Sequence, residues 1–423
     1  MTIGLLFLAF FALLALSMPI GIAILIVCVG YILLTGGMQP NFFISAFFSS
    51  LDSFPLLAVP LFMLSGDLMT KGGIARQLFD LAHKLVGKLP GGHAMAAVLS
   101  CLFFGAVSGS APATVAAIGG LMIPMLSDIG YDRKWATGLL ASAGALGVMI
   151  PPSIPMVMYG VVTGESVSDL FIAGIIPGIL VGLLLCIYCY VYCKKEKPVL
   201  KWEAEEKSFL RVLNDSKWAI LMPVIILGGI YSGKFTPTEP AAISVLYGLI
   251  ICLLVTKTIK FKELPALFKS TAASMGPLMI VCASATVLGK ILTVERAPEI
   301  IANLILSISS NKIVVFLLVN LFLLVVGALM DTVAAILIFA PVLYPIMTSL
   351  GMSGIQFGCL MTVNLAVGFI TPPIGMNLYV ASGLTGLSVV DISKKIVIPM
   401  LLMIVAVLIV TYIPAVSLCL LPG

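Results

Sequence analysis

Two short segments of the chain carry hydroxyl and carboxylate side chains inside otherwise apolar sequence. The first holds Ser108 and Ser110 within GAVSGSAPATVAAI, and the second holds Asp331 and Thr332 within GALMDTVAAILIFA. Hydroxyl, carboxylate and backbone carbonyl oxygens are the ligands that hard cations prefer. Because the segments contain no imidazole or thiolate, they suit Na+ better than a transition metal.

Each of these segments is followed by a pair of prolines, in MIPPSIPMVMY (149–159) and in FITPPIGMNLY (369–379). A proline inside a helix removes a backbone donor and frees a carbonyl group. Asn364 and Thr371 place further polar side chains beside the second break. The N-terminus of a half-helix presents N–H groups and a positive dipole end, which suits a carboxylate. The residues therefore predict Na+-coupled uptake of an organic anion.

The acidic residues also have structural alternatives. A carboxylate at membrane depth costs roughly 2.5–3.5 kcal/mol on insertion scales, so Asp331 is expected to bind something rather than only to cap a helix. Its partner in the other segment is Gly109, so two ion sites built on these segments cannot be identical. Glu239, beside Pro240, is either a cap charge at a helix start or a mechanistic acid. The serine hydroxyls could likewise be helix caps.

The composition of the chain indicates a membrane protein. Of its 423 residues, 61% are hydrophobic and only 10% are charged, and the mean hydropathy is +1.21. Soluble domains are about 45–50% apolar and roughly 25% charged, so much of this apolar surface must face lipid. The net charge of +5 therefore does not indicate that the protein binds nucleic acid. No GxxxxGK[ST] motif is present, so ATP hydrolysis at a P-loop is not expected, nor is an organic cofactor.

An internal repeat organises nearly the whole chain. Residues 105–177 align with residues 327–399 at an offset of 221–222, and MPIGIAI at residue 18 aligns with EPAAISV at residue 239. Two such helix breaks in corresponding places of two repeats are typical of the binding sites of secondary transporters. The sequence thus predicts an all-α polytopic membrane protein of two repeats.

Each repeat is expected to hold about five transmembrane helices, an amphipathic arm helix, a re-entrant helical hairpin and a broken helix. The predicted units are repeat 1 over 1–193, a polar connector over 194–216 and repeat 2 over 217–423. Within repeat 1 they are an arm over 73–88, a hairpin over 93–127 and a broken helix over 135–163; within repeat 2 they are an arm over 295–310, a hairpin over 312–350, a broken helix over 354–385 and a last helix over 391–421.

The basic residues predict the orientation. With five crossings per repeat, and with both termini outside, 19 of the 23 Lys and Arg residues fall on the cytoplasmic side. That distribution follows the positive-inside rule. Because five is an odd number, the two repeats have inverted topology. The N- and C-termini are accordingly predicted to be periplasmic.

At GAVSGSAPATVAAIG, at the PPSI break and at the GALMDT and TPPIGMNLYV segments, the chain closely resembles the large membrane subunit of tripartite ATP-independent periplasmic (TRAP) transporters. The resemblance spans essentially the whole chain. It implies a multi-pass protein of the bacterial inner membrane that works with a separate small four-helix membrane subunit and a periplasmic substrate-binding protein. It also implies an elevator fold, coupling to two or more Na+ ions and an organic acid substrate, with sialic acid favoured slightly over C4-dicarboxylates.

The resemblance also assigns site residues. Ser108 and Ser110 match tip positions near sodium and substrate, and Asp331 and Thr332 match the second tip. The expected substrate-binding residues are Ser108, Ser110, Asn364 and Thr371. The expected Na+ ligands are Ser108, Gly147, Pro151, Gly327, Asp331, Thr332 and Gly368.

Three alternative functions remain open at this point. A stand-alone Na+-coupled dicarboxylate elevator transporter shares the architecture but needs no binding protein. Proton coupling is disfavoured because no paired intramembrane acids or histidines form a relay. An intramembrane enzyme would need a catalytic dyad, and neither His83 nor His93 lies near the serines in the sequence.

Overall fold

The computed structural model describes every residue except 1, 36–38, 197–207, 302–310, 373–374 and 422–423. The described residues form helices joined by short loops, with no strand among them. Ten helical segments in this part of the chain are long and apolar enough to cross a bilayer. The predicted all-α polytopic architecture is confirmed.

The first half of the chain begins with helices that pack as antiparallel neighbours and ends with a long helix. Its elements are α1 (Thr2–Ala15), α2 (Ile20–Thr35), α3 (Pro40–Ser49), α4 (Ala58–Lys71), α5 (Ile74–Val86), α6 (Gly92–Ser108), α7 (Ala111–Thr114), a π-helix (Val115–Gly119), α8 (Gly120–Asp128), α9 (Arg133–Ala143), α10 (Leu146–Met149), α11 (Ile154–Thr163) and α12 (Val167–Glu196).

The second half of the chain continues from the polar segment before Phe209. Its elements are α13 (Phe209–Tyr231), α14 (Thr238–Ile250) continued by a π-helix (Ile251–Val255), α15 (Leu264–Val294), α17 (Lys312–Leu329), α18 (Thr332–Ser349), α19 (Gly354–Gly368), α20 (Met376–Thr385), α21 (Val389–Tyr412) and α22 (Ala415–Leu418).

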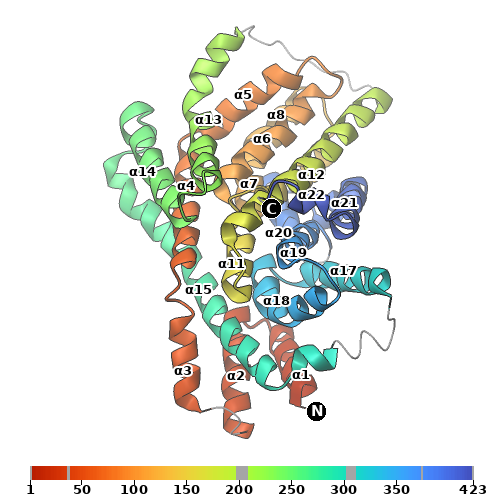
Figure 1. Ribbon diagram of the computed structural model, residues 1–423. Coiled ribbons are helices and arrows are strands. Elements are labelled where there is room, and N and C mark those ends of the chain that lie inside the picture. Colours follow the sequence, from red (N-terminus) through yellow and green to blue (C-terminus); the bar gives the residue numbers. More distant parts are fainter. Residues whose placement is uncertain (1, 36–38, 197–207, 302–310, 373–374, 422–423) are drawn as a thin grey trace.

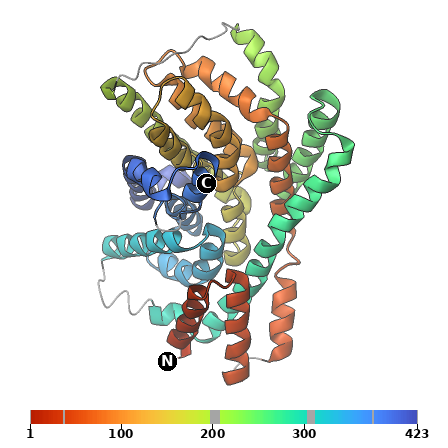
Figure 2. The same cartoon turned by 180° about the vertical axis from the view of Figure 1, so that it is seen from behind.

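The helices form two groups that lie side by side. The helices α2, α3, α4, α14 and α15 line one flank of the molecule, and α12, α17, α19 and α21 lie on the other flank (Figures 1 and 2). Within the first group α14 packs on α4 and α15 packs on α2; within the second, α17 and α21 pack on α19. The hairpin helix α6 and the broken helix α9–α11 belong to the second group by their contacts with α12, α19 and α21.

The boundaries differ from the predicted ones in three places. Helix α13 begins at Phe209, inside the segment predicted as connector, because a polar helical turn precedes its apolar part. The predicted last helix 391–421 is two helices, since Pro414 cannot continue the hydrogen bonding of α21. The segment 40–49, for which no helix is predicted, forms α3.

Most residues of the first predicted arm, 73–88, form helix α5. Ile74, Leu78 and Leu81 of α5 are buried, as the helical spacing requires, whereas Leu85 is exposed. Most of the second predicted arm, at 302–310, lies outside the described residues.

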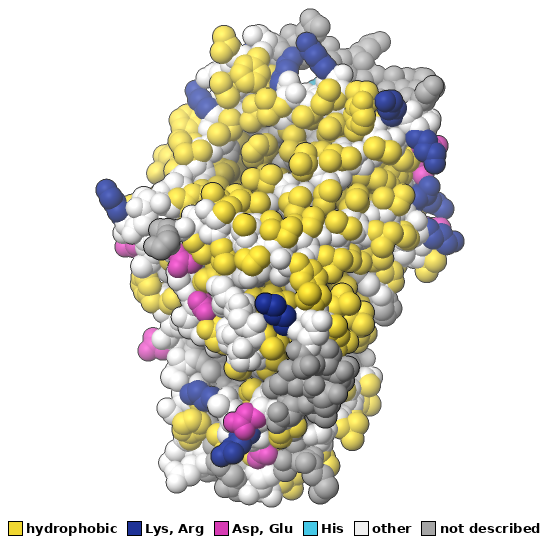
Figure 3. Space-filling view, turned by 45° about the vertical axis from the view of Figure 1, so that its right-hand side comes forward, with side chains coloured by type: hydrophobic (Ala, Val, Ile, Leu, Met, Phe, Trp, Pro, Cys, Tyr) yellow, Lys and Arg dark blue, Asp and Glu magenta, His cyan; other side chains and the backbone are white. Residues whose placement is uncertain are grey.

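Apolar side chains cover much of the outer surface. In Figure 3 they form a broad continuous area, with Lys and Arg side chains gathered along its upper and right-hand rims. Large hydrophobic residues are exposed on α2, α13 and α21, among them Leu33, Val224 and Leu401. Apolar surface of this extent matches lipid rather than water.

Candidate functional site

The first hairpin turns at a glycine that can adopt a left-handed conformation. Helix α6 ends at Ser108, and Gly109 follows with φ +60°. Such a backbone is readily adopted only by glycine. Ser110 then caps α7, because its Oγ accepts a hydrogen bond from the N–H of Ala113 at 3.4 Å. The serine-rich segment therefore folds into a helix end, a tight turn and a new helix start.

Three oxygen atoms gather inside this tip. The Oγ of Ser108 lies 3.1 Å from Oγ1 of Thr114, and the Thr114 hydroxyl donates to the carbonyl of Ser110 at 2.8 Å. Ser108 is 2% exposed and Thr114 is fully buried. Two hydroxyls and a carbonyl at this spacing are the kind of ligands that Na+ takes.

The first helix break lies directly against this tip. A Cβ atom on Gly147 would lie 2.3 Å from Oγ1 of Thr114 and 2.6 Å from the carbonyl oxygen of Ser110. Gly147 also faces Gly105 of α6, where an added Cβ would lie 2.9 Å from the Gly147 Cα. Only glycine fits at either position. The backbone of α10, which precedes the break, is thereby packed closely against the tip.

Beyond Gly147 the helix is interrupted from Ile150 to Ser153. Pro151 is buried there. Helix α11 restarts with Ser153 as its cap, and the N–H of Ile154 donates to the carbonyl of Gly109 at 3.3 Å. This bond joins the start of the second half-helix to the turn of the hairpin.

The second hairpin turns at Asp331. Its Oδ2 caps α18 by accepting hydrogen bonds from the N–H groups of Val333 at 2.9 Å and Ala334 at 3.4 Å. Thr332, the first residue of α18, is 1% exposed. The same carboxylate thus has a structural role as a cap, and it stands at the predicted ligand position of the tip.

A close glycine contact recurs at the second tip. A Cβ on Gly368 would lie 2.3 Å from the carbonyl oxygen of Gly327, and one on Gly327 would lie 3.2 Å from the Gly368 Cα. Gly327 and Gly368 correspond in the repeat to Gly105 and Gly147. The structure therefore brings a hairpin and a broken helix together at corresponding glycines in both halves.

Asn364 and Thr371 are engaged in hydrogen bonds near the second break. The side-chain nitrogen of Asn364 donates to the backbone carbonyl and the side-chain oxygen of Asn320, at 3.1 and 2.9 Å, and Asn320 in turn donates to Thr411. The Oδ1 atom of Asn364 is buried, with no hydrogen-bond partner among the described residues. The hydroxyl of Thr371 donates to the carbonyl of Val367 at 2.8 Å.

The two halves are interlocked around these breaks. Helix α11, after the first break, packs on α18 of the second hairpin, and α20, after the second break, packs on the π-helix of the first hairpin. Asn377 of α20 donates to the carbonyl of Ala141 on α9 at 2.9 Å. The predicted site residues of both repeats therefore belong to one packed unit.

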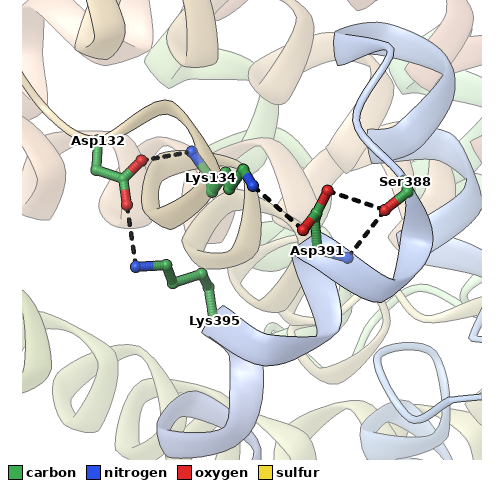
Figure 4. A network of polar contacts seen from close by, with 5 residues as sticks. All are labelled: Asp132, Lys134, Ser388, Asp391 and Lys395. Atoms are coloured by element: carbon green, nitrogen blue, oxygen red, sulfur yellow. Dashed lines mark hydrogen bonds and ion pairs between the residues drawn. The ribbon is translucent and has the colours of Figure 1, made fainter.

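An exposed ion-pair network ties the halves together at one end of this unit. Figure 4 shows Asp132 paired with Lys395 at 3.1 Å, and Lys134 paired with Asp391 at 3.2 Å. Asp391 also accepts a hydrogen bond from Ser388, the cap of α21. The network joins the start of α9 to the start of α21.

Three features of the site were not predicted. Thr114 is the first; it follows Ser110 by four residues, so its hydroxyl could have been predicted to reach the Ser110 carbonyl. The buried Asn377, whose Oδ1 is unpaired among the described residues, is the second. The π-helix Val115–Gly119 is the third. Such π-bulges are frequent at functional sites, but no residue pattern in the sequence predicts them.

Glu239 lies in the first turn of α14, which is not one of the helices of this unit. Its Oε2 accepts hydrogen bonds from the N–H and the hydroxyl of Thr236, at 2.8 and 3.0 Å, at the start of α14. The structure thus places this residue as a helix-start cap in the first group of helices.

Comparisons with known proteins give the family. A family model described as the DctM component of the tripartite ATP-independent periplasmic transporter matches residues 7–416. The chain belongs to the DctM family of TRAP transporters. It is therefore a large permease subunit, and its relatives are transporter permeases rather than enzymes.

Relatives in this family are named after different substrates. The chain is 41% identical to the isethionate TRAP transporter permease DctMQ of Oleidesulfovibrio alaskensis over 96% of its own length, but it spans only 64% of that longer protein. It is 40% identical to the C4-dicarboxylate permease DctM of Pseudomonas aeruginosa, covering 88% of this chain and 87% of the relative. It is 36% identical to the sialic acid permease SiaM of Vibrio cholerae, with 86% of each covered.

A solved structure shares the fold of this DctM-family chain. The crystal structure of the Alcanivorax borkumensis YdaH transporter superimposes with a TM-score of 0.59 over 91% of both chains, at 16% sequence identity. This likeness concerns the fold alone.

Proposed function

We propose that this DctM-family permease imports an organic anion across the bacterial inner membrane, driven by Na+. The observation that carries the proposal is that each hairpin packs closely against a broken helix, at Gly105–Gly147 in the first half and at Gly327–Gly368 in the second. Interrupted helices at membrane depth are tolerated only where their freed backbone groups bind something or line a cavity. The oxygens of Ser108, Ser110 and Thr114 suit one Na+ ion, and the Asp331 carboxylate suits another.

The proposed Na+ ligands are those that the sequence predicts, with Thr114 added. Gly147, Pro151, Gly327 and Gly368 would contribute backbone oxygens, and Thr332 a hydroxyl. Ser108, Ser110, Asn364 and Thr371 remain the proposed contacts to the substrate. At Asn364 the support is its buried Oδ1, for which the described part of the chain offers no hydrogen-bond partner.

The substrate proposal is a small organic anion. The relatives named above are associated with a sulfonate, with C4-dicarboxylates and with sialic acid, all of which carry an acidic group. An acidic group of this kind is attracted by the positive N-terminal ends of half-helices such as α11 and α20. The relatives of higher identity favour isethionate or a C4-dicarboxylate as the first compounds to test, ahead of sialic acid.

The partners follow from the family. A small four-helix membrane subunit would complete the membrane complex, and a periplasmic binding protein would deliver the substrate. Both termini of this chain would then lie in the periplasm, as the distribution of basic residues predicts.

The proposed movement is that of an elevator. Helices α2, α4, α14 and α15 would form a scaffold, and the unit built from both hairpins and both broken helices would slide against it. The arm α5 would link the two, because it packs on α13 as well as on the hairpin helix α6.

The test is uptake by proteoliposomes that contain this chain and its small subunit. Labelled isethionate, succinate and sialic acid would be offered one at a time, with and without the matching binding protein. Uptake of one anion only in the presence of its binding protein is the expected result. Uptake without any binding protein would instead identify a stand-alone carrier and would refute the tripartite proposal.

A further inference from the structure

An apolar groove opens on the outer surface between α13 and the hairpin unit. Its volume is about 440 Å³, and its walls are Leu, Ile, Val, Ala, Phe and Pro side chains together with Tyr231. Val224 of α13 and Ile179 of α12 both line it, and they are 54% and 50% exposed. The groove is therefore open to the surroundings of the membrane-spanning helices.

The groove extends from the arm to the first helix break. Its lining includes Leu78 and Leu81 of the arm α5 and Ile150 and Pro151 of the first helix break. Along α13 it extends from Ile220 to Tyr231, which at 1.5 Å per residue is about 16 Å. One leaflet of the bilayer contributes about 15 Å of hydrocarbon, half of a core of about 30 Å. The length of the groove thus matches one leaflet.

The end of the groove beside the arm α5 has residues typical of the membrane depth at which lipid headgroups lie. There the hydroxyl of Ser216 donates to the carbonyl of Gln77 at 2.9 Å, which joins α13 to α5. The exposed Lys217 follows, and its Nζ lies 5.2 Å from the ring centre of Trp218. Tryptophan is enriched at the membrane–water interface. Lys217 stands three residues before Ile220, so a cation lies about one helical turn above the apolar walls.

We propose that this groove binds an anionic phospholipid, with one acyl chain between α13 and α6 and the phosphate group at Lys217. An acyl chain fits walls that are almost wholly apolar, whereas a polar solute does not. A basic residue near the membrane surface attracts anionic lipid. In the proposed elevator, this lipid would lie on the boundary between scaffold and moving unit, beside Pro151.

The first experiment is photolabelling of the purified membrane complex. The probe is phosphatidylglycerol with a diazirine at the end of one acyl chain, and labelled peptides are located by mass spectrometry. We expect labels on the α6 and α13 peptides that line the groove, at higher yield than in the apolar hollow of about 470 Å³ between α1 and α2, around Leu5 and Ile26. Equal yields at both places would show non-specific contact with bulk lipid, and labels on the small subunit would show that the subunit covers the groove. Either result would overturn the proposal.

Two pairs of variants sharpen this test. Val224→Trp should fill the groove and remove its labels, whereas Leu221→Trp, which is on the same helix, 40% exposed and outside the groove lining, should leave them. Lys217→Ala should lower labelling by phosphatidylglycerol about fivefold, the factor that one basic residue near a membrane surface contributes.

Lys269→Ala, at an exposed position on α15, is the control for that change. A phosphatidylcholine probe, which carries no net charge, should respond to neither lysine variant. If Lys217→Ala and Lys269→Ala have the same effect on phosphatidylglycerol labelling, the headgroup assignment is wrong. None of these readouts depends on transport. The lipid proposal can therefore be refuted while the proposed transport function still holds.

Discussion

At the residue scale, Asp331 combines two roles that one substitution can separate. Asparagine caps helices about as well as aspartate, so Asp331→Asn should keep α18 capped while it removes the charge. Losing even a group that only orients a metal ligand weakens metal binding about 10- to 100-fold. We therefore expect Asp331→Asn to raise the Na+ concentration for half-maximal uptake at least tenfold, with little change in melting temperature.

The measurement is uptake as a function of Na+ concentration, with melting temperature read on the same preparation. Asp391→Asn is the matched control, because Asp391 also lies in the first turn of a helix but is exposed and far along the chain from both tips. An unchanged Na+ dependence in Asp331→Asn would remove this carboxylate from the ion site.

The glycine contacts give a prediction about packing. In Gly368→Ala the new Cβ would lie 2.3 Å from the carbonyl oxygen of Gly327, a backbone atom that cannot move aside by itself. Overpacking of this kind typically costs about 1–3 kcal/mol. We expect a lower melting temperature and loss of uptake.

Gly276→Ala is the control for that variant. Gly276 lies within α15, with no atom within 4 Å of an added Cβ, so alanine there should be neutral or stabilising. A Gly368→Ala protein with normal stability and uptake would contradict the close contact.

The residue types of the site could be predicted in large part, but their environment could not. Ser108, Ser110, Asp331 and the Pro-Pro breaks stand out because polar and helix-breaking residues are expensive in an apolar chain. Thr114 was missed, since a threonine four residues into a helix reads as an ordinary packing residue. The hydrogen bond from Asn364 to Asn320 joins residues 44 positions apart, a pairing that only the packing of α17 on α19 creates.

At the scale of elements, the ion pairs between α9 and α21 should contribute little to stability. The four side chains are 36–45% exposed, and exposed ion pairs typically contribute about 0.2–1 kcal/mol. A double-mutant cycle of Asp132→Asn and Lys395→Gln should give a coupling energy in that range, and salt should reduce it. Asparagine keeps the cap that Asp132 provides to the N–H of Lys134.

The cycle is measured by unfolding at low and high salt. A coupling energy well above this range, or one that salt leaves unchanged, would mean that the pair is screened from solvent by a partner subunit.

Element types were predicted better than element ends. Apolar runs and Pro-Pro pairs predicted helical segments at most of the places where the structure has helices. The break between α21 and α22 is at Pro414. It was not predicted because the sequence on both sides of this proline is apolar, which suggested one continuous helix. The start of α13 at Phe209 was missed because its first turns are polar, although they continue the helix.

At the scale of the whole molecule, the sliding movement can be tested with disulfides. A Cβ on Gly289 of α15 would lie 3.5 Å from the Cβ of Pro341 on α18, close to the usual Cβ–Cβ span of about 3.5–4.5 Å in a disulfide. The variant Gly289→Cys/Pro341→Cys, with the nine native cysteines replaced, should lock the proposed scaffold to the second hairpin. We expect uptake to stop on oxidation and to recover on reduction.

The matched control joins α14, of the first group, to α13, which packs on it. Gly229→Cys/Pro240→Cys joins α13 to α14, where the corresponding distance is 3.2 Å. Oxidation of this pair should leave uptake unchanged. If a quantitatively formed disulfide between α15 and α18 also left uptake unchanged, the two groups of helices would not move against each other as proposed.

The most direct test of Na+-coupled anion import is the response of transport to an imposed ion gradient. Proteoliposomes with the membrane complex and its binding protein would receive labelled anion under an inward Na+ gradient, an inward proton gradient or neither. The account predicts accumulation above equilibrium with the Na+ gradient alone, and none when the Na+ concentrations are equal. Accumulation driven by protons, or equilibration that ignores the Na+ gradient, would contradict it.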